Sequence, residues 1–166
     1  MTGVILLDVL KEFTERAISE LIMPVQLQKG DTEQVYRCAD VYKMRLPDST
    51  SAQKKAPYII HQVITGKHKT QDNKVNIRSI FCVFCDDEQE GSLMLLNLVE
   101  RLEIELLKTV IIGGQFELDR DEGVEFLIYP DNTAPFYAGE MSTVWKLRTI
   151  KDERASTFLH TGTWQK

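Results

Sequence analysis

The residues of this chain best suited to covalent or redox chemistry are two cysteines in a Cys-x-x-Cys spacing, Cys82 and Cys85. This spacing occurs in redox-active dithiols and in zinc sites. A redox cysteine is usually activated at a helix N-terminus, which lowers the thiol pKa. Here an apolar, strand-like stretch precedes the pair, and acidic residues follow it. We interpret both as structural cysteines, with a small intracellular thiol or redox enzyme as the alternative from another functional class.

A zinc site would need two further ligands near this pair. Four residues could supply them, but none has ligand spacing: Cys38, His61, His68 and His160. The histidines could also act as bases toward a nucleophile such as Ser79 or Cys85, although no Gly-x-Ser-x-Gly elbow accompanies them. The sequence therefore predicts no catalytic residue, no metal and no cofactor.

Three charged segments remain as candidate contact surfaces. An acidic run directly precedes a predicted helix, where acids complement the positive end of the helix dipole. A basic segment occupies the tip of a predicted hairpin, and a second acidic turn follows residue 118. We take the charged residues of these segments as assembly-interface candidates: Lys67, His68, Lys69, Asp86, Asp87, Glu88, Glu90, Asp119, Asp121 and Glu122.

Two helices are predicted from apolar residues that recur every three or four positions. The first covers roughly residues 1–22, with Thr2 as its N-cap and Pro24 beyond its end. The second covers about 92–109, with Gly113 and Gly114 expected to stop it. Its main buried face is expected to be Leu95, Val99, Leu102 and Leu106.

The remaining segments read as strands. Residues 57–65 and 74–85 predict a long antiparallel hairpin with a polar tip. Both faces of its second strand are apolar near Phe84, which indicates cover on both sides. Residues 35–45 predict a further strand, as do three segments in the second half of the chain: 115–118, 124–129 and 141–147.

This order of elements predicts an α+β fold, a two-layer sandwich of a mostly antiparallel sheet and two packed helices. We expect one domain over residues 1–150, containing a flexible loop at 46–56, and a C-terminal arm at 151–166. The 166 residues are 43% hydrophobic and 27% charged, which is ordinary for a globular protein.

The net charge and the number of cysteines narrow the functional class and the compartment of the protein further. A net charge of −5 disfavours a protein that binds nucleic acid mainly through phosphates. Three cysteines indicate a reducing compartment without a disulfide framework. The N-terminus lacks the basic start of a secretory signal, and no apolar run is long enough to span a bilayer.

Residues 76–150 carry an ordered set of motifs. A strand ends in acids at 86–90, a helix contains LLNLVERL, the GGQFEL segment follows, and FYAGEMSTVW closes the set at 136–145. The pattern resembles the tail terminator, or tail-completion, proteins of long-tailed bacteriophages and prophages. The resemblance covers residues 57–150 and, more loosely, 1–24.

The resemblance implies an α+β subunit that caps the finished tail tube, usually as a ring of six, and that receives the head connector. Its partners would be further copies of itself, the tail tube protein and the head connector protein. It would lie in the tail or neck of the virion, after assembly in the bacterial cytoplasm. No enzyme activity, cofactor or membrane association is implied, and neither is sequence-specific binding of nucleic acid.

We therefore expect a structural assembly protein, a tail terminator or head–tail joining component. A minor tail or tail-assembly protein of the same module is the nearest alternative. A regulatory binding module is a further possibility.

Overall fold

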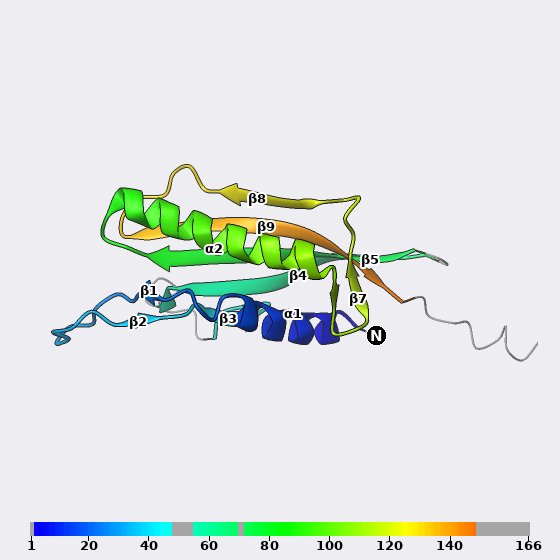
Figure 1. The fold of residues 1–166 in the computed structure, drawn as a ribbon, viewed down its shortest axis with the longest axis horizontal. Coiled ribbons are helices and arrows are strands. Elements are labelled where there is room, and N and C mark those ends of the chain that lie inside the picture. Colours follow the sequence, from blue (N-terminus) through cyan, green and yellow to red (C-terminus); the bar gives the residue numbers. More distant parts are fainter. Residues whose placement is uncertain (1, 48–54, 70–71, 149–166) are drawn as a thin grey trace, which may run out of the picture.

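The computed structural model describes residues 2–47, 55–69 and 72–148. It shows a curled sheet with both helices on one of its faces (Figure 1). The helices are α1 (Gly3–Ala17) and α2 (Glu88–Thr109). The strands are β1 (Met23–Pro24), β2 (Tyr36–Arg37), β3 (Asp40–Lys43), β4 (Tyr58–His68), β5 (Asn73–Phe84), β6 (Ile111–Ile112), β7 (Phe116–Leu118), β8 (Val124–Ile128) and β9 (Phe136–Leu147). The predicted α+β fold with a mostly antiparallel sheet is confirmed.

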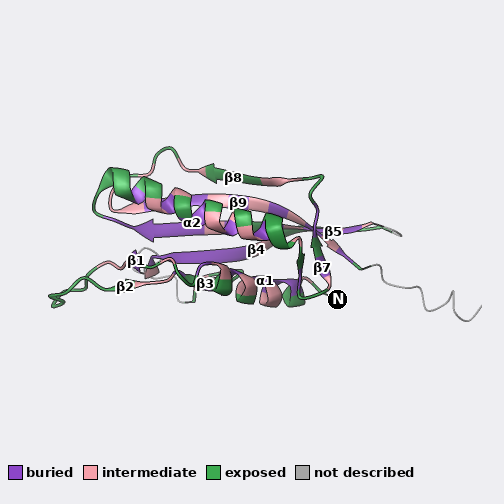
Figure 2. Cartoon of the chain, in the orientation of Figure 1, coloured by how far each residue is buried: buried purple, intermediate pink, exposed green. Residues whose placement is uncertain are grey.

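The main sheet has the strand order β3-β4-β5-β9-β7-β6, and β8 also pairs with β9. All pairings in it are antiparallel except that of β3 with β4. α1 packs on β3 and β4, and α2 packs on β5 and β9. Figure 2 shows the buried residues along the central strands beneath these helices.

The β4–β5 hairpin forms as predicted and extends further toward its tip. One face of β5 places Ile77, Phe81 and Val83 in the main core beneath the helices. The opposite face places Cys82 and Phe84 in a second apolar cluster with Tyr58 and Ile60. The prediction that both faces are covered near Phe84 is therefore confirmed.

α1 begins after its predicted N-cap, since the Thr2 hydroxyl accepts a hydrogen bond from the Ile5 N–H at 3.5 Å. It ends at Ala17, five residues before the predicted end at residue 22. The chain turns at Ile18, which is completely buried.

α2 begins at Glu88, four residues before the predicted start. The Asp87 carboxylate caps it by accepting hydrogen bonds from the Gln89 and Glu90 N–H groups, both at 2.9 Å. Gly91 therefore lies inside the helix, where a Cβ atom would be 2.2 Å from a Tyr137 ring carbon. This glycine allows close packing of α2 on β9.

The predicted role of Gly113 and Gly114 as the stop of this helix is wrong. α2 ends at Thr109, and Val110 takes the positive φ of 59° that follows it. Gly113 and Gly114, with φ of 56° and 66°, form the turn between β6 and β7. Positive φ in a tight turn is the common use of glycine.

The single strand predicted over residues 35–45 is also wrong. β2 pairs with β1, whereas β3 joins the main sheet beside β4. Between them the Arg37 guanidinium donates to the carbonyl groups of Cys38, Lys55 and Pro57, which fixes the bend. Most of the predicted loop at 46–56, namely 48–54, and the whole predicted arm at 151–166 lie outside the described residues.

Candidate functional site

The Cys-x-x-Cys pair lies at the end of β5, and its two side chains belong to apolar clusters on opposite faces of the sheet. Cys85 belongs to the main core and Cys82 to the second cluster, with exposed fractions of 7% and 5%. Burial raises the pKa of the Cys82 thiol to about 11, against a smaller lowering by its hydrogen bond with Tyr58. A buried thiol with a raised pKa is a poor nucleophile, so the geometry gives no support to the thiol-enzyme alternative.

His61 lies in a buried polar chain with two hydroxyl groups. Its Nε2 is 2.9 Å from Thr14 Oγ1 on α1, and its Nδ1 is 2.8 Å from Ser79 Oγ on β5. Ser79 is the direct antiparallel partner of His61, so the strand register creates this contact. A serine hydroxyl that is hydrogen-bonded to a histidine ring is the arrangement in which a histidine base activates a serine nucleophile.

The surroundings of His61 do not suit catalysis. His61 and Thr14 are completely buried, and Ser79 is 2% exposed, so no substrate can reach the hydroxyl. Burial lowers the pKa of His61 to about 3, which keeps the ring neutral. The chain of hydrogen bonds satisfies polar groups beneath α1, and its role is structural.

The described residues that were weighed as further zinc ligands, Cys38, His61 and His68, form no metal site. Among the residues that the structure describes, no group of three or more His, Cys, Asp and Glu side chains is arranged to hold a metal ion. His68 is exposed near the hairpin tip, and Cys38 donates a hydrogen bond to the Ser19 carbonyl. His160 lies outside the described residues.

Two of the three candidate acids in the second acidic segment are paired within the chain, whereas Asp121 is exposed and enters no ion pair among the described residues. Asp119 is 1% exposed, with its carboxylate 2.7 Å from the Lys74 ammonium and 3.5 Å from that of Lys146. Glu122 is 3.1 Å from the same Lys74 group. The Lys74 hydrogen bond holds the pKa of Asp119 below its usual value. These contacts fix the turn after β7 to β5 and β9. Asp119 and Glu122 are therefore already paired with lysines of the same chain.

The first acidic segment, residues 86–90, has no ion pair within the described part of the chain. Asp86, Glu88 and Glu90 are exposed, and Asp87 caps α2. The basic segment is equally unpaired among described residues, since Lys67 and Lys69 enter no salt bridge there. Figure 1 places residues 86–90 at one end of the long sheet and the β4–β5 tip at the other.

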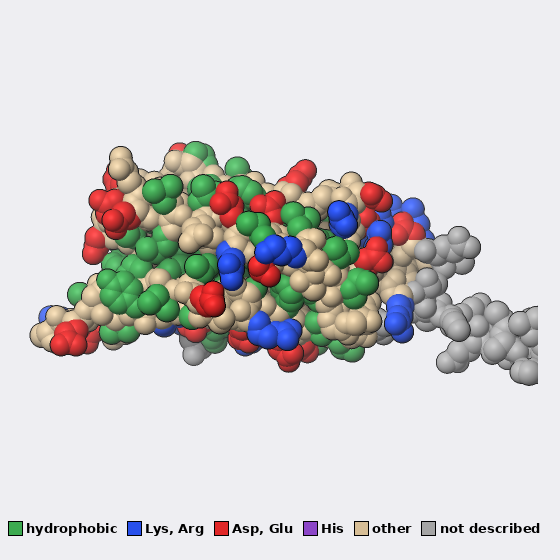
Figure 3. Space-filling view, in the orientation of Figure 1, with side chains coloured by type: hydrophobic (Ala, Val, Ile, Leu, Met, Phe, Trp, Pro, Cys, Tyr) green, Lys and Arg blue, Asp and Glu red, His purple; other side chains and the backbone are tan. Residues whose placement is uncertain are grey.

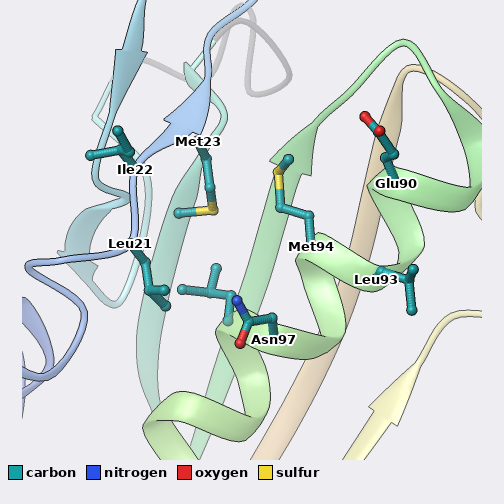
Figure 4. Close-up of a pocket in the computed structure, with 8 residues that line it drawn as sticks. Leu21, Ile22, Met23, Glu90, Leu93, Met94 and Asn97 are labelled. Atoms are coloured by element: carbon teal, nitrogen blue, oxygen red, sulfur yellow. The ribbon is translucent and has the colours of Figure 1, made fainter.

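A groove beside residues 86–90 is the feature that the sequence pattern does not reveal. It has a volume of about 460 Å³ and lies between residues 21–23 and the first half of α2 (Figure 4). Its lining is Leu21, Ile22, Met23, Glu90, Leu93, Met94, Asn97 and Leu98. Met23 and Met94 face one another across it. Figure 3 shows an apolar area here, with acidic side chains at the adjoining end of the molecule.

Two of the residues that line this groove have the most exposed large apolar side chains of the described structure. Ile22 and Leu93 are 67% and 66% exposed. The exposure of Leu93 could have been predicted from the sequence, because Leu93 lies outside the predicted buried face of the helix. Exposed apolar side chains beside a groove are typical of interaction sites.

Comparison with known proteins assigns the chain to no family. No protein-family model and no curated protein matches this chain. None of the described helices has the length and apolar character needed to cross a membrane.

Proposed function

We propose that this chain is a structural assembly protein of a long-tailed bacteriophage or prophage, the tail terminator or head–tail joining component that caps the tail tube as a ring. The motif order over residues 57–150 supports this family. The fold agrees with the α+β architecture that the resemblance implies. The role requires surfaces that bind and no reacting group.

One observation carries the proposal: the two ends of the long sheet present different unpaired surfaces. One end holds an apolar groove beside acidic residues 86–90, and the other holds the basic hairpin tip. A subunit of a ring contacts one neighbour through one patch and the next neighbour through another. Surfaces of opposite character at opposite ends suit such a contact.

The mechanism is association alone. Copies of the chain would close into a ring on the last layer of the tail tube protein, and the exposed face of that ring would receive the head connector protein. Complementary charges would speed the encounter and select the partner. The assembled protein would reside in the tail or neck of the virion.

The test is a co-assembly experiment with tail tubes that lack a terminator. The mass of the free protein is measured by light scattering across a concentration series, and tubes with and without it are imaged by negative stain. We expect rings near six times the 19.1 kDa subunit mass, in solution or on tube ends, together with tubes of uniform length. A protein that neither binds tube ends nor limits their length would refute the proposal.

A further inference from the structure

The apolar groove and the hairpin tip are complementary in chemical character, since each combines apolar side chains with charges of opposite sign. The groove combines an apolar lining with Glu90, the last residue of the exposed acidic segment 86–90. The tip segment, residues 64–69, is exposed at every position and carries Ile64 together with Lys67 and Lys69. We propose that the groove receives residues 64–69 from a second copy of this chain. This inference rests on the proposed ring and identifies the two surfaces that would join its subunits.

The tip of the hairpin is built to project. β3 pairs only with Tyr58–His61, so β4 beyond Gln62 has β5 as its one neighbouring strand among described residues. The register shifts between Val63 and Thr65, which leaves Ile64 as the extra residue of a β-bulge. Bulges commonly redirect a side chain, and Ile64 is 48% exposed.

The groove and the tip of one chain cannot meet. β5 has 12 residues and runs from the hairpin tip to the acidic segment. At about 3.3 Å per residue, a strand of this length separates its ends by roughly 40 Å. The contact therefore joins different copies, and it is heterologous because each copy uses a different patch.

Charge favours the same pairing. Asp86 and Glu90 have no ion-pair partner in the described part of the chain, and the same holds for Lys67 and Lys69. Near the tip, Asp119 and Glu122 are held by Lys74 and Lys146 and so do not compete for the tip lysines. Asp72 and Asp121 also lie close to the tip and enter no ion pair among the described residues. Docking would thus bring unpaired opposite charges together and cover exposed apolar side chains in one step.

The first experiment reverses the charges of each surface separately. One variant carries Lys67→Glu and Lys69→Glu, and the other carries Asp86→Lys and Glu90→Lys. We expect each alone to associate about tenfold or more weakly than the wild type in sedimentation velocity, because like charges would face each other. An equal mixture should regain association, since each variant then finds an opposite charge on its neighbour.

The control for charge reversal is Glu12→Lys with Glu100→Lys, two exposed acids outside the groove. This variant should associate as the wild type does. Wild-type association of both test variants, or a mixture that does not recover, overturns the proposal. A wild-type chain that stays monomeric at every concentration overturns it as well.

The second experiment tests the apolar part of the contact. Ile22→Ser with Leu93→Ser removes exposed apolar side chains beside the groove, so the fold should be retained and association should weaken about tenfold or more. Ile104→Ser with Leu107→Ser is the matched control, since both residues are exposed on α2 outside the groove. Equal effects of the two double variants contradict docking in the groove.

Tube capping by the same variants separates the two proposals. If the wild type associates as proposed but does not cap tail tubes, the docking surface stands and the terminator function fails. If variants with altered groove and tip surfaces cap tubes as well as the wild type, the docking surface fails and the function stands.

Discussion

Lowering the pH from about 7 to about 5 should destabilise the protein through His61 by about 2 kcal/mol. The ring is completely buried and is held between Thr14 and Ser79. Burial lowers its pKa to about 3, whereas an unfolded chain gives a histidine pKa of about 6.5.

The direction follows from proton binding. Between these two pKa values the unfolded chain binds a proton at His61 that the folded chain does not. Unfolding is therefore favoured as the pH falls, and the free energy of unfolding decreases by up to about 1.4 kcal/mol per pH unit. The full stability is present above the unfolded pKa. A loss of about 2 kcal/mol is large against a total of about 5–15 kcal/mol.

The assay is urea unfolding followed by circular dichroism at a series of pH values. The His61→Asn variant keeps a polar side chain and removes the titrating group, so its free energy of unfolding should fall less steeply with decreasing pH than that of the wild type. His68→Asn is the matched control, because His68 is exposed near the hairpin tip and its replacement should leave the wild-type slope unchanged.

Equal pH slopes for the wild type and His61→Asn would refute the reasoning. If His61→Asn does not fold, NMR titration of the His61 ring in the wild-type protein decides the same point. The ring resonances should show no titration between about pH 7 and about pH 5. A normal titration curve would mean that the ring is protonated in the folded state.

Two further predictions concern packing and buried charge. Gly91→Ala should destabilise the protein by about 1–3 kcal/mol despite its better helix propensity, because the new methyl group would lie 2.2 Å from a Tyr137 ring carbon. Urea unfolding should show no comparable loss for the exposed neighbour Ser92→Ala, and an unchanged Gly91→Ala would contradict the close packing. Asp119→Asn should cost about 1–3 kcal/mol at neutral pH by removing the charge-assisted bond to Lys74. Because the pKa of Asp119 is lowered on folding, its contribution is lost as the pH falls through the folded pKa. The difference between wild type and variant should therefore shrink in acid, and a pH-independent difference would contradict this.

The features that the sequence predicted well depend on local periodicity. The four residues predicted as the main face of the second helix, Leu95, Val99, Leu102 and Leu106, are all buried. The apolar residues on both faces of β5 likewise predicted cover on both sides near Phe84, and Phe81 and Cys82 lie in two separate buried clusters. Such patterns follow from the 3.6-residue and two-residue repeats of helix and strand, so they need no knowledge of distant residues.

The errors concern residues that have more than one structural use. A glycine can end a helix, form a turn or admit a neighbouring side chain. Gly91 serves the third purpose and Gly113 the second, while Val110 adopts positive φ where a glycine was expected. The choice among these uses depends on Tyr137 and on the pairing of β6 with β7, which no local pattern encodes.

The same limit applies to the candidate site. Whether a charged segment is paired within the chain or exposed for a partner depends on strand register. Lys74 reaches Asp119 only because β5 and β7 both pair with β9, so an acid that looked free in the sequence is paired in the fold. Residues 86–90 face no such strand and stay unpaired in the described structure. The fold thus separates the candidate acids into those that form ion pairs within the chain and those that stay unpaired on the surface. Assembly tests should therefore target Asp86 and Glu90, because reversing Asp119 would weaken the fold before it could report on any contact between subunits.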